Sequence, residues 1–316
     1  MQIVPRNRLQ NQIKYMDSFP EIEGYDIFEK IGEGGMSTVW KARDIESGAI
    51  VAIKILRKEM AENEEDFKRF MLEANVMREI EEQGIVRCFD SGSCSGIWYY
   101  VMEYVDGYNF STLLARKHHL PESDCLLICQ SVAVALENAW TNYGIVHCDI
   151  KPENIMINSD GIVKLTDLGL CHIFENCDEN SIAVPDQVLG TPAYISPEQI
   201  YGDVEPDCRS DIYSLAATLY HMASGHILFF RMDNEQMLRA HCDEECRAND
   251  PRCFQPSLSE GFCQMLEAML VKNRDERIGD WNDVIDMCRN VESGGLFKPR
   301  TGQGNSSMKL NAKTYQ

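Results

Sequence analysis

The chain has 316 residues, of which 44% are hydrophobic and 25% are charged, and its formal net charge at pH 7 is −20. These values are ordinary for a folded protein that can bury a sizeable core, so they exclude a largely disordered chain. The negative charge argues against nucleic acid as the main partner, because phosphate backbones are bound mainly by clustered lysine and arginine.

Cysteines and apolar runs indicate the cellular setting. Thirteen cysteines are scattered through the sequence, and we expect no secretory signal peptide before them. This distribution favours reduced thiols and a cytoplasmic protein over a disulfide framework. No apolar run approaches the roughly 20 residues that cross a bilayer, so we expect no membrane segment in this chain. Met1 is expected to be the natural start, and the sequence leaves open whether the natural chain extends beyond residue 316.

The elements expected along the chain fall into two halves. Residues 1–24 lack periodicity and are predicted to be a tail. Short β-rich runs at 38–42, 50–56 and 98–103, with one helical pattern at 64–80, predict a small sheet with one helix. From about residue 109 apolar residues recur at helical spacing, which predicts a helical second half. Residues 292–316 are rich in Gly, Ser, Asn, Lys and Gln and are predicted to be a second tail.

A glycine-rich turn gives the first chemical signal. Residues 32–39 read Gly-Glu-Gly-Gly-Met-Ser-Thr-Val, and glycines allow a backbone to approach a polyphosphate closely. A Rossmann dinucleotide site would need a helix after the turn and an acidic residue about twenty positions later. A strand is expected here instead, and Lys54 stands near that position. Lys54 ends an apolar strand pattern, and Glu73 on the helical pattern could hold its ammonium group.

Three later motifs follow in a fixed order. Residues 147–154 read His-Cys-Asp-Ile-Lys-Pro-Glu-Asn, residues 167–169 read Asp-Leu-Gly, and residues 190–198 read Gly-Thr-Pro-Ala-Tyr-Ile-Ser-Pro-Glu. Together with the glycine turn, Lys54 and Glu73, they resemble the eukaryotic-like protein kinase superfamily, particularly its bacterial serine/threonine branch. The resemblance covers about residues 25–291.

This resemblance implies a bilobal α+β protein kinase fold in residues 25–291. The N-lobe, residues 25–103, would hold a small antiparallel β-sheet with one main helix. A hinge at 103–107 would lead to a larger, mainly helical C-lobe at 108–291. The tails 1–24 and 292–316 would flank this domain.

The resemblance also implies a chemistry, the transfer of the γ-phosphate of ATP to serine or threonine hydroxyls of proteins. Asp149 would accept the proton of the hydroxyl or orient that hydroxyl for in-line attack. Lys151 would neutralise charge on the γ-phosphate, and Thr191 would help to orient both residues. Lys54 would contact the α and β phosphates and pair with Glu73. The combination of Lys151 and Thr191 is typical of serine/threonine enzymes.

Metal and nucleotide contacts follow from the same resemblance. Asn154 and Asp167 would hold Mg²⁺ or Mn²⁺, since hard cations prefer amide and carboxylate oxygens. The glycine turn would cover the phosphates, apolar side chains would enclose the adenine, and the backbone of Glu103 and Val105 would read its edge. The residues expected around ATP are Gly32, Glu33, Gly34, Gly35, Met36, Ser37, Val39, Ala52, Lys54, Met102 as gatekeeper, Glu103, Val105 and Met156.

Other matching positions are expected to be structural. Glu198 and Arg277 should form a buried ion pair, and Asp211 should brace the catalytic loop from a helix. Two departures from the family pattern, Ser37 for the third loop glycine and Leu168 for the usual phenylalanine, should leave activity intact.

Regulation and the alternatives complete the expectations. Cys148 replaces an arginine that in many kinases binds a phosphate on the activation segment, and Ser181 is the only hydroxyl-bearing residue between Gly169 and Gly190. Activity is therefore expected without phosphorylation of that segment.

A pseudokinase scaffold and a small-molecule phosphotransferase remain alternatives. His241, Cys242, Cys246 and Cys253 leave open whether they bind zinc or are ordinary free thiols. The physiological substrate, the upstream signal and the oligomeric state stay open.

Overall fold

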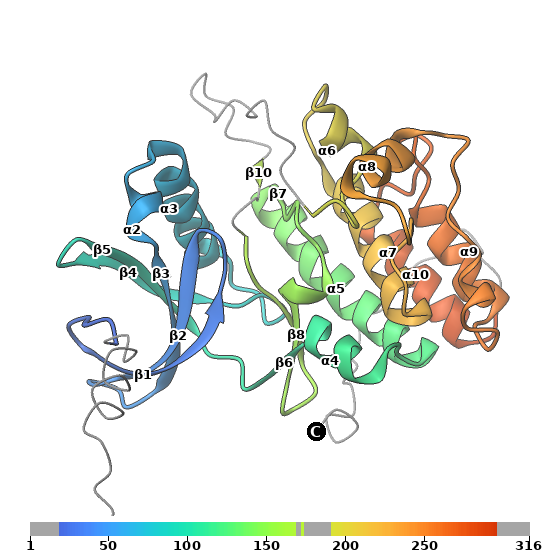
Figure 1. Ribbon diagram of the computed structural model, residues 1–316. Helices are drawn as coiled ribbons and strands as arrows, with labels where there is room; N and C mark the ends of the chain where they lie inside the picture. The colour runs from blue at the N-terminus through green and yellow to red at the C-terminus, as the bar shows by residue number, and fades with distance from the viewer. Residues whose placement is uncertain (1–18, 169–171, 174–190, 296–316) are drawn as a thin grey trace, which may run out of the picture. The chain divides into compact units, whose positions relative to one another are not determined.

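The computed structural model describes residues 19–168, 172–173 and 191–295. The chain divides into two compact units, one formed by residues 1–67 and 89–104 and the other by residues 68–88 and 105–316. The smaller unit is built on a β-sheet, and the larger unit is mainly helical (Figure 1). The α+β class expected from the sequence is therefore confirmed.

The smaller unit contains a five-stranded sheet with the order β1-β2-β3-β5-β4. Strands β1, β2, β3 and β5 pair antiparallel in turn. The strands are β1 (Tyr25–Glu33), β2 (Ser37–Asp44), β3 (Ile50–Leu56), β4 (Cys88–Cys94) and β5 (Ile97–Glu103). The predicted runs at 38–42, 50–56 and 98–103 correspond to β2, β3 and β5.

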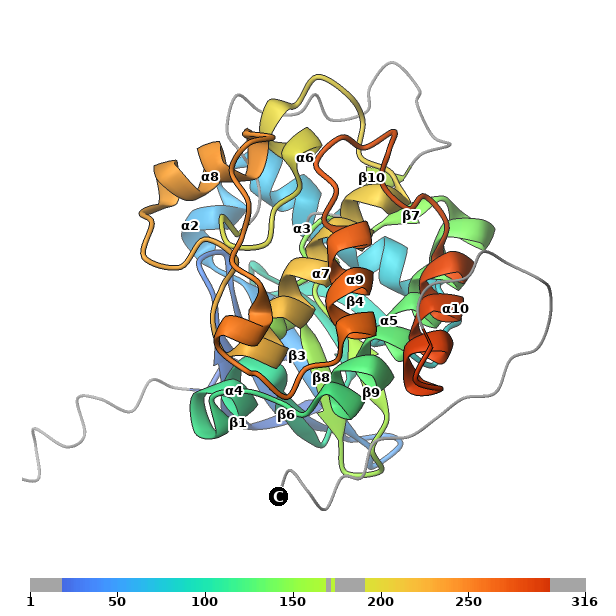
Figure 2. The same ribbon diagram turned by 90° about the vertical axis from the view of Figure 1, so that its right-hand side faces the viewer.

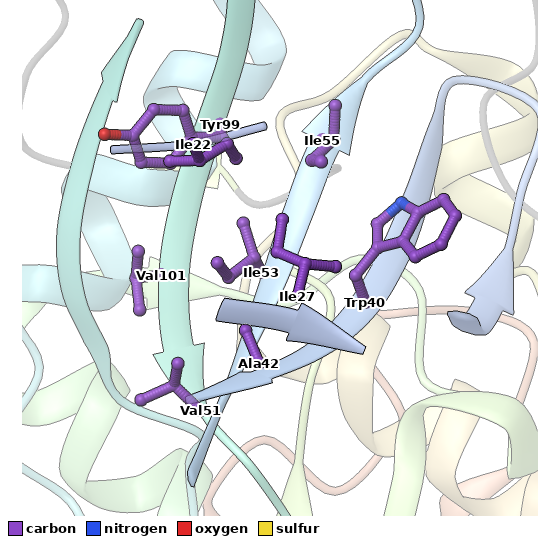
Figure 3. Packing of buried hydrophobic residues seen from close by; sticks show 9 residues of the cluster. All are labelled: Ile22, Ile27, Trp40, Ala42, Val51, Ile53, Ile55, Tyr99 and Val101. Atoms are coloured by element: carbon purple, nitrogen blue, oxygen red, sulfur yellow. The ribbon is translucent and has the colours of Figure 1, made fainter. Parts of the chain in front are cut away.

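Apolar side chains of the four neighbouring strands β1, β2, β3 and β5 form the core of this unit. Ile27 and Ile53 lie close together in the cluster, and Trp40 covers one side of it (Figure 3). Ile53 is completely buried, since β3 is central and almost every one of its residues is covered. Ile22 packs into the same cluster and bridges to Tyr25, so ordered packing begins before residue 25.

Two helices follow β3, namely α2 (Lys58–Ala61) and α3 (Glu64–Glu79). The side-chain oxygen of Asn63 accepts hydrogen bonds from the backbone N–H groups of Glu65 and Asp66, at 2.9 and 3.2 Å. This cap and three acidic residues in the first turn fix the start of α3. The helix predicted at 64–80 is thus confirmed, and its residues from Lys68 onward belong to the larger unit.

The larger unit is organised around α7 (Cys208–Ser224), a helix that is buried on nearly every side. Helix α9 lies between α7 and α10, and α10 packs along α5 (Figure 2). The other helices are α4 (Phe110–Lys117), α5 (Glu122–Tyr143), α6 (Pro197–Tyr201), α8 (Asn234–Cys242), α9 (Glu260–Met269) and α10 (Trp281–Glu292), with the 3₁₀ turns η2 (Pro152–Asn154) and η3 (Pro251–Cys253).

Two small sheets in this unit carry the loops that matter below. One has the order β6-β8-β9, with β6 (Gly107–Asn109), β8 (Ile155–Asn158) and β9 (Val163–Leu165), and the other pairs β7 (Ile145–Val146) with β10 (His172–Ile173). Gly107 is required sterically, because a β-carbon there would lie 1.8 Å from the carbonyl oxygen of Ile157. Within the described ranges, no helix is both long and apolar enough to span a membrane.

Candidate active site

The loop between β7 and β8 is held from below by a buried carboxylate. The carboxylate of Asp211, in the first turn of α7, accepts hydrogen bonds from the backbone N–H groups of His147 at 2.7 Å and Cys148 at 2.8 Å. Cys148 adopts a left-handed backbone with φ of 64°, which a non-glycine residue keeps only where its surroundings enforce it. Burial raises the pKa of Asp211 to about 7, while the two N–H donors favour its charged form. The predicted bracing by Asp211 is confirmed.

His147 ties the same loop to the segment after β9. Its Nε2 lies 3.1 Å from the carbonyl oxygen of Thr166, and its Nδ1 accepts the backbone N–H of Asp149 at 3.3 Å. Since a carbonyl only accepts and an N–H only donates, the ring is neutral with its proton on Nε2. Burial lowers the pKa of His147, which agrees with that state.

Four of the predicted catalytic and metal-binding residues lie together on this loop and beside it. The ammonium Nζ of Lys151 is 2.6 Å from Asp149 Oδ2 and 3.0 Å from Thr191 Oγ1. Thr191 Oγ1 donates to Asp149 Oδ1 at 3.3 Å, and Asn154 Nδ2 donates to Asp149 Oδ2 at 3.1 Å. The side chains of Asp149 and Lys151 remain 13% and 21% exposed, so a substrate can reach them. The arrangement presents an oriented carboxylate acceptor next to a cation.

Asn154 and Asp167 offer a donor set suited to a hard cation. The Nδ2 group of buried Asn154 donates to the backbone oxygen of Asp149 at 2.9 Å and also to its carboxylate. The side-chain oxygen Oδ1 of Asn154 is therefore the atom that can coordinate a metal ion. Asp167 follows β9 with a left-handed φ of 68°, and the Thr166 N–H bonds to the Asn154 carbonyl at 3.0 Å. One amide and one carboxylate oxygen fit Mg²⁺ or Mn²⁺.

The His/Cys residues considered for zinc do not form a metal cluster. Among the described residues, no group of three or more His, Cys, Asp or Glu side chains is arranged to hold a metal ion. His241 is instead fully buried, with Nδ1 2.8 Å from the Tyr213 hydroxyl and its ring against Phe229. All eleven cysteines in the described ranges are free thiols.

The glycine turn and Lys54 belong to the smaller unit. Residues 34–36 connect β1 to β2, and Gly34 N–H bonds to the Ser37 carbonyl at 2.9 Å, which confirms the predicted strand-turn-strand. A β-carbon on Gly35 would meet nothing within 4 Å, so the turn is open above its backbone. Lys54 is buried on β3, with Nζ 5.6 Å from the centre of the Tyr100 ring.

The remaining predicted nucleotide contacts divide between the units. Ala52 pairs with Met102 across β3 and β5 in the smaller unit, whereas Glu73, Val105 and Met156 belong to the larger one. The pairing of Lys54 with Glu73 and the shared nucleotide site involve both units, so they stay predictions. Ser181 and the motif glycines 169 and 190 lie outside the described residues.

Arg277 and Glu198 form a buried ion pair at the start of α6. Arg277 donates to Glu198 through two nitrogens, at 2.7 and 3.0 Å, and Ser210 donates to the same carboxylate at 2.7 Å. Burial raises the pKa of Glu198, but Arg277 and Ser210 outweigh it and leave the pKa below its usual value. This predicted pair is confirmed.

Two positioning residues were not anticipated from the motifs. Gln199 Nε2 donates to the Cys148 carbonyl at 2.8 Å, and Thr218 Oγ1 donates to the Ile150 carbonyl at 3.1 Å. The sequence signal at Gln199 is its place three residues after Ser196, a capping-box spacing. That spacing predicts the start of α6 and says nothing about a contact with a loop fifty residues earlier.

Comparison with known proteins gives a consistent result. Residues 25–288 match the model of the protein kinase domain. The chain is 40% identical over 261 residues to a probable serine/threonine-protein kinase, CPE1738, of Clostridium perfringens, covering 83% of this chain and 37% of that protein. It is 37% identical over 253 residues to the serine/threonine-protein kinase PknB of Mycobacterium leprae, which covers 78% of this chain and 39% of that protein. It is also 37% identical over 205 residues to the serine/threonine-protein kinase PrkC of Bacillus subtilis, which covers 65% of this chain and 31% of that protein. The chain thus spans less than half the length of these relatives.

Proposed function

Since this chain belongs to the protein kinase family, we propose that it is an ATP-dependent kinase that phosphorylates serine or threonine hydroxyls of proteins. The observation that carries the proposal is the Asp149 carboxylate, which hydrogen bonds from Lys151, Asn154 and Thr191 orient. Phosphoryl transfer depends mainly on such positioning and charge neutralisation.

In the proposed reaction, Asp149 holds the substrate hydroxyl in line with the γ-phosphorus and takes up its proton. The bond from the hydroxyl oxygen to phosphorus forms while the bond from phosphorus to the bridging oxygen of ATP breaks, with ADP as leaving group. Lys151 stabilises the charge on the transferring phosphoryl oxygens. Thr191 fixes the positions of Lys151 and Asp149 relative to each other through hydrogen bonds with both side chains.

The metal and nucleotide contacts complete the proposal. Asn154 and Asp167 would hold Mg²⁺ or Mn²⁺, which would supply positive charge against the phosphate oxygens of the nucleotide. Lys54, paired with Glu73, contacts the α and β phosphates, and the turn from Gly32 to Ser37 covers them. The free amide oxygen of Asn154 supports this assignment.

We also propose that the activation segment does not need phosphorylation. Cys148 offers neither the charge nor the forked donors with which an arginine would bind a phosphate. Its backbone is instead held on both sides, by Asp211 at the N–H and by Gln199 at the carbonyl. The free thiols of the described residues support a reducing, cytoplasmic setting for this domain.

A phosphotransfer assay tests the proposal. Purified chain with labelled ATP, Mg²⁺ and a mixed protein substrate should yield phosphoserine or phosphothreonine. Asp149→Asn should lower kcat about 10²- to 10⁴-fold, because the proton acceptor is lost. Asp167→Asn should abolish transfer at any Mg²⁺ concentration, while thermal unfolding shows that both variants are folded.

Four outcomes would contradict the proposal. Undiminished activity of folded Asp167→Asn would overturn the metal assignment. Phosphotyrosine as the main product would exclude the serine/threonine class. Nucleotide binding without transfer would identify a pseudokinase, and transfer only to small-molecule acceptors would identify the other alternative.

A further inference from the structure

The larger unit contains a cavity that takes no part in the proposed catalysis. Its volume is about 710 Å³, within the range of roughly 300–1,000 Å³ found for ligand sites. It lies between α7, the segment after α8, and α9 with the turn that follows it. Its floor is apolar and aromatic, formed by Tyr213, Tyr220, Leu228, Phe229, Leu266 and Leu270.

One wall of the cavity is the segment 244–250, which is anchored at both ends. The Lys272 ammonium donates to the carbonyls of Ala240, Asp243 and Cys246. At the other end the Tyr220 hydroxyl donates to the Asn249 carbonyl at 2.9 Å. This backbone is therefore a fixed wall and not a loose loop.

The rim of the cavity has an excess of negative charge. Five carboxylates line it, against the two cations Arg247 and Lys272, and the donors of Lys272 already bind carbonyls. Asp250 pairs with Arg252 at 2.6 Å, and Glu276 accepts a hydrogen bond from Asn273 at 3.2 Å.

The other three carboxylates are the ones that a ligand can use. Glu244, Glu245 and Glu267 are exposed and form no ion pair with any residue in the described part of the chain. An apolar floor below unpaired carboxylates suits a segment that carries apolar side chains next to cations.

The chain itself supplies such a segment directly after the described residues. Residues 296–316 contain four basic side chains, Lys298, Arg300, Lys309 and Lys313, and no acidic one, although the whole chain has a net charge of −20. They begin with Leu296 and Phe297, and apolar residues recur at Leu310 and Tyr315.

The point where this segment leaves the fold is close to the cavity. The Gly295 carbonyl lies beside Gly261 in the first turn of α9, where a β-carbon would be 3.0 Å from it. Glu267 lies about 9 Å further along the same helix, on another face. Ten extended residues span roughly 33 Å, which is enough to pass around a helix about 10–12 Å across.

We propose that residues 296–316 bind in the cavity between α7 and α9 of their own chain, with apolar side chains on the floor and basic side chains at Glu244, Glu245 and Glu267. The cavity is then an internal docking site for a basic peptide segment. This inference does not depend on catalytic activity.

Limited proteolysis of the full chain tests the docking, because trypsin cleaves after Arg300, Lys309 and Lys313 of the segment, whereas Lys298 precedes Pro299 and is not a cleavage site. The triple variant Glu244→Gln, Glu245→Gln, Glu267→Gln should release the segment and speed cleavage there at least fivefold at low salt. The control Glu59→Gln, Glu62→Gln, Glu65→Gln removes three exposed charges from α2 and the start of α3 and should match wild type. Raising the salt concentration should bring wild type to the rate of the first variant. Equal cleavage of the two triple variants would overturn the proposal.

Zero-length carbodiimide crosslinking identifies the occupant of the cavity. With mixed ¹⁵N-labelled and unlabelled full chains, lysines 298, 309 and 313 should couple to cavity carboxylates within one copy. Coupling only between labelled and unlabelled copies would assign the cavity to a second molecule, and coupling to carboxylates outside the cavity would exclude the site. Either result would overturn the proposal.

Discussion

The side-chain amide of Gln199 donates a hydrogen bond of 2.8 Å to the backbone carbonyl of Cys148. Helix α6 thereby holds the peptide that carries the left-handed φ at position 148 and leads directly to Asp149. The same glutamine accepts the Ser196 hydroxyl at 2.9 Å through Oε1, so its amide orientation is fixed from both ends. The position of the Asp149 carboxylate depends on this contact as well as on Asp211.

Gln199→Leu should lower kcat about fivefold with little change in the KM for ATP. The variant loses a hydrogen bond of about 1 kcal/mol that positions Asp149, and it keeps the side-chain volume. The control is Gln264→Leu, whose amide donates to Glu260 at 3.2 Å on the solvent-facing side of α9 and should leave kcat unchanged. Steady-state kinetics at saturating peptide measure both, and a change confined to the KM for ATP would contradict the positioning role.

Arg277→Lys should lower the free energy of unfolding by about 1–3 kcal/mol, because lysine keeps the charge beside Glu198 but lacks the donors that satisfy the buried acceptors around it. The guanidinium also donates to the carbonyls of Val271, Arg209 and Lys272, and a lysine cannot reproduce that fork. The matched control is Arg239→Lys in α8, whose arginine side chain is 78% exposed and pairs with Glu235 on the surface. It should change the unfolding free energy by less than about 0.5 kcal/mol. Denaturant unfolding measures both, and equal effects would show that burial of the pair is unimportant.

His241 should make the fold sensitive to mild acid. Burial, followed by the nearby Lys272 charge, lowers the pKa of His241 to about 4 from 6.5. The neutral ring is therefore favoured in the folded state. Its contribution to the free energy of unfolding is complete above pH 6.5 and is lost as the pH falls toward 4. The shift corresponds to a contribution on the order of 3 kcal/mol.

The variant His241→Gln tests this contribution. Its unfolding free energy should be lower than that of wild type at pH 7.5, and the difference should shrink between pH 6.5 and 4. His119→Gln changes an exposed histidine and should keep the wild-type pH profile. A constant difference between wild type and His241→Gln across this range would show that His241 is not the titrating group.

Phosphatase-treated enzyme and Ser181→Ala should both retain near-normal turnover of an external peptide. The reason is that Cys148 provides no guanidinium for a phosphate, and that Glu175, Asp178 and Glu179 near Ser181 would repel one. Initial rates in the first minutes, before autophosphorylation accumulates, measure this. A loss of tenfold or more, about 1.4 kcal/mol in the barrier, would show that the segment needs phosphate.

Local patterns in the sequence were sufficient to predict the elements that carry the chemistry. Alternating and continuous apolar runs predicted β2, β3 and β5, helical spacing predicted α3, and the glycine turn lies between β1 and β2. Strand β4 was not predicted, because its sequence, Cys-Phe-Asp-Ser-Gly-Ser-Cys, is mostly polar and its pairing with β5 depends on the neighbouring strand.

Short, ordered patterns in the sequence were sufficient to identify the family motifs, the candidate residues and the supporting residues Asp211 and Glu198. The packing of distant segments was needed to show that Asp149 contacts Thr191, 42 residues later in the sequence, and that Gln199 holds the Cys148 carbonyl. It also showed that His241 is buried beside Tyr213. It also decided that carboxylates after α8 and on α9 share one cavity rim. These contacts join segments that are far apart in the sequence and that packing around α7 brings together. The local periodicity of a segment predicts its secondary structure but carries no information about its distant partners.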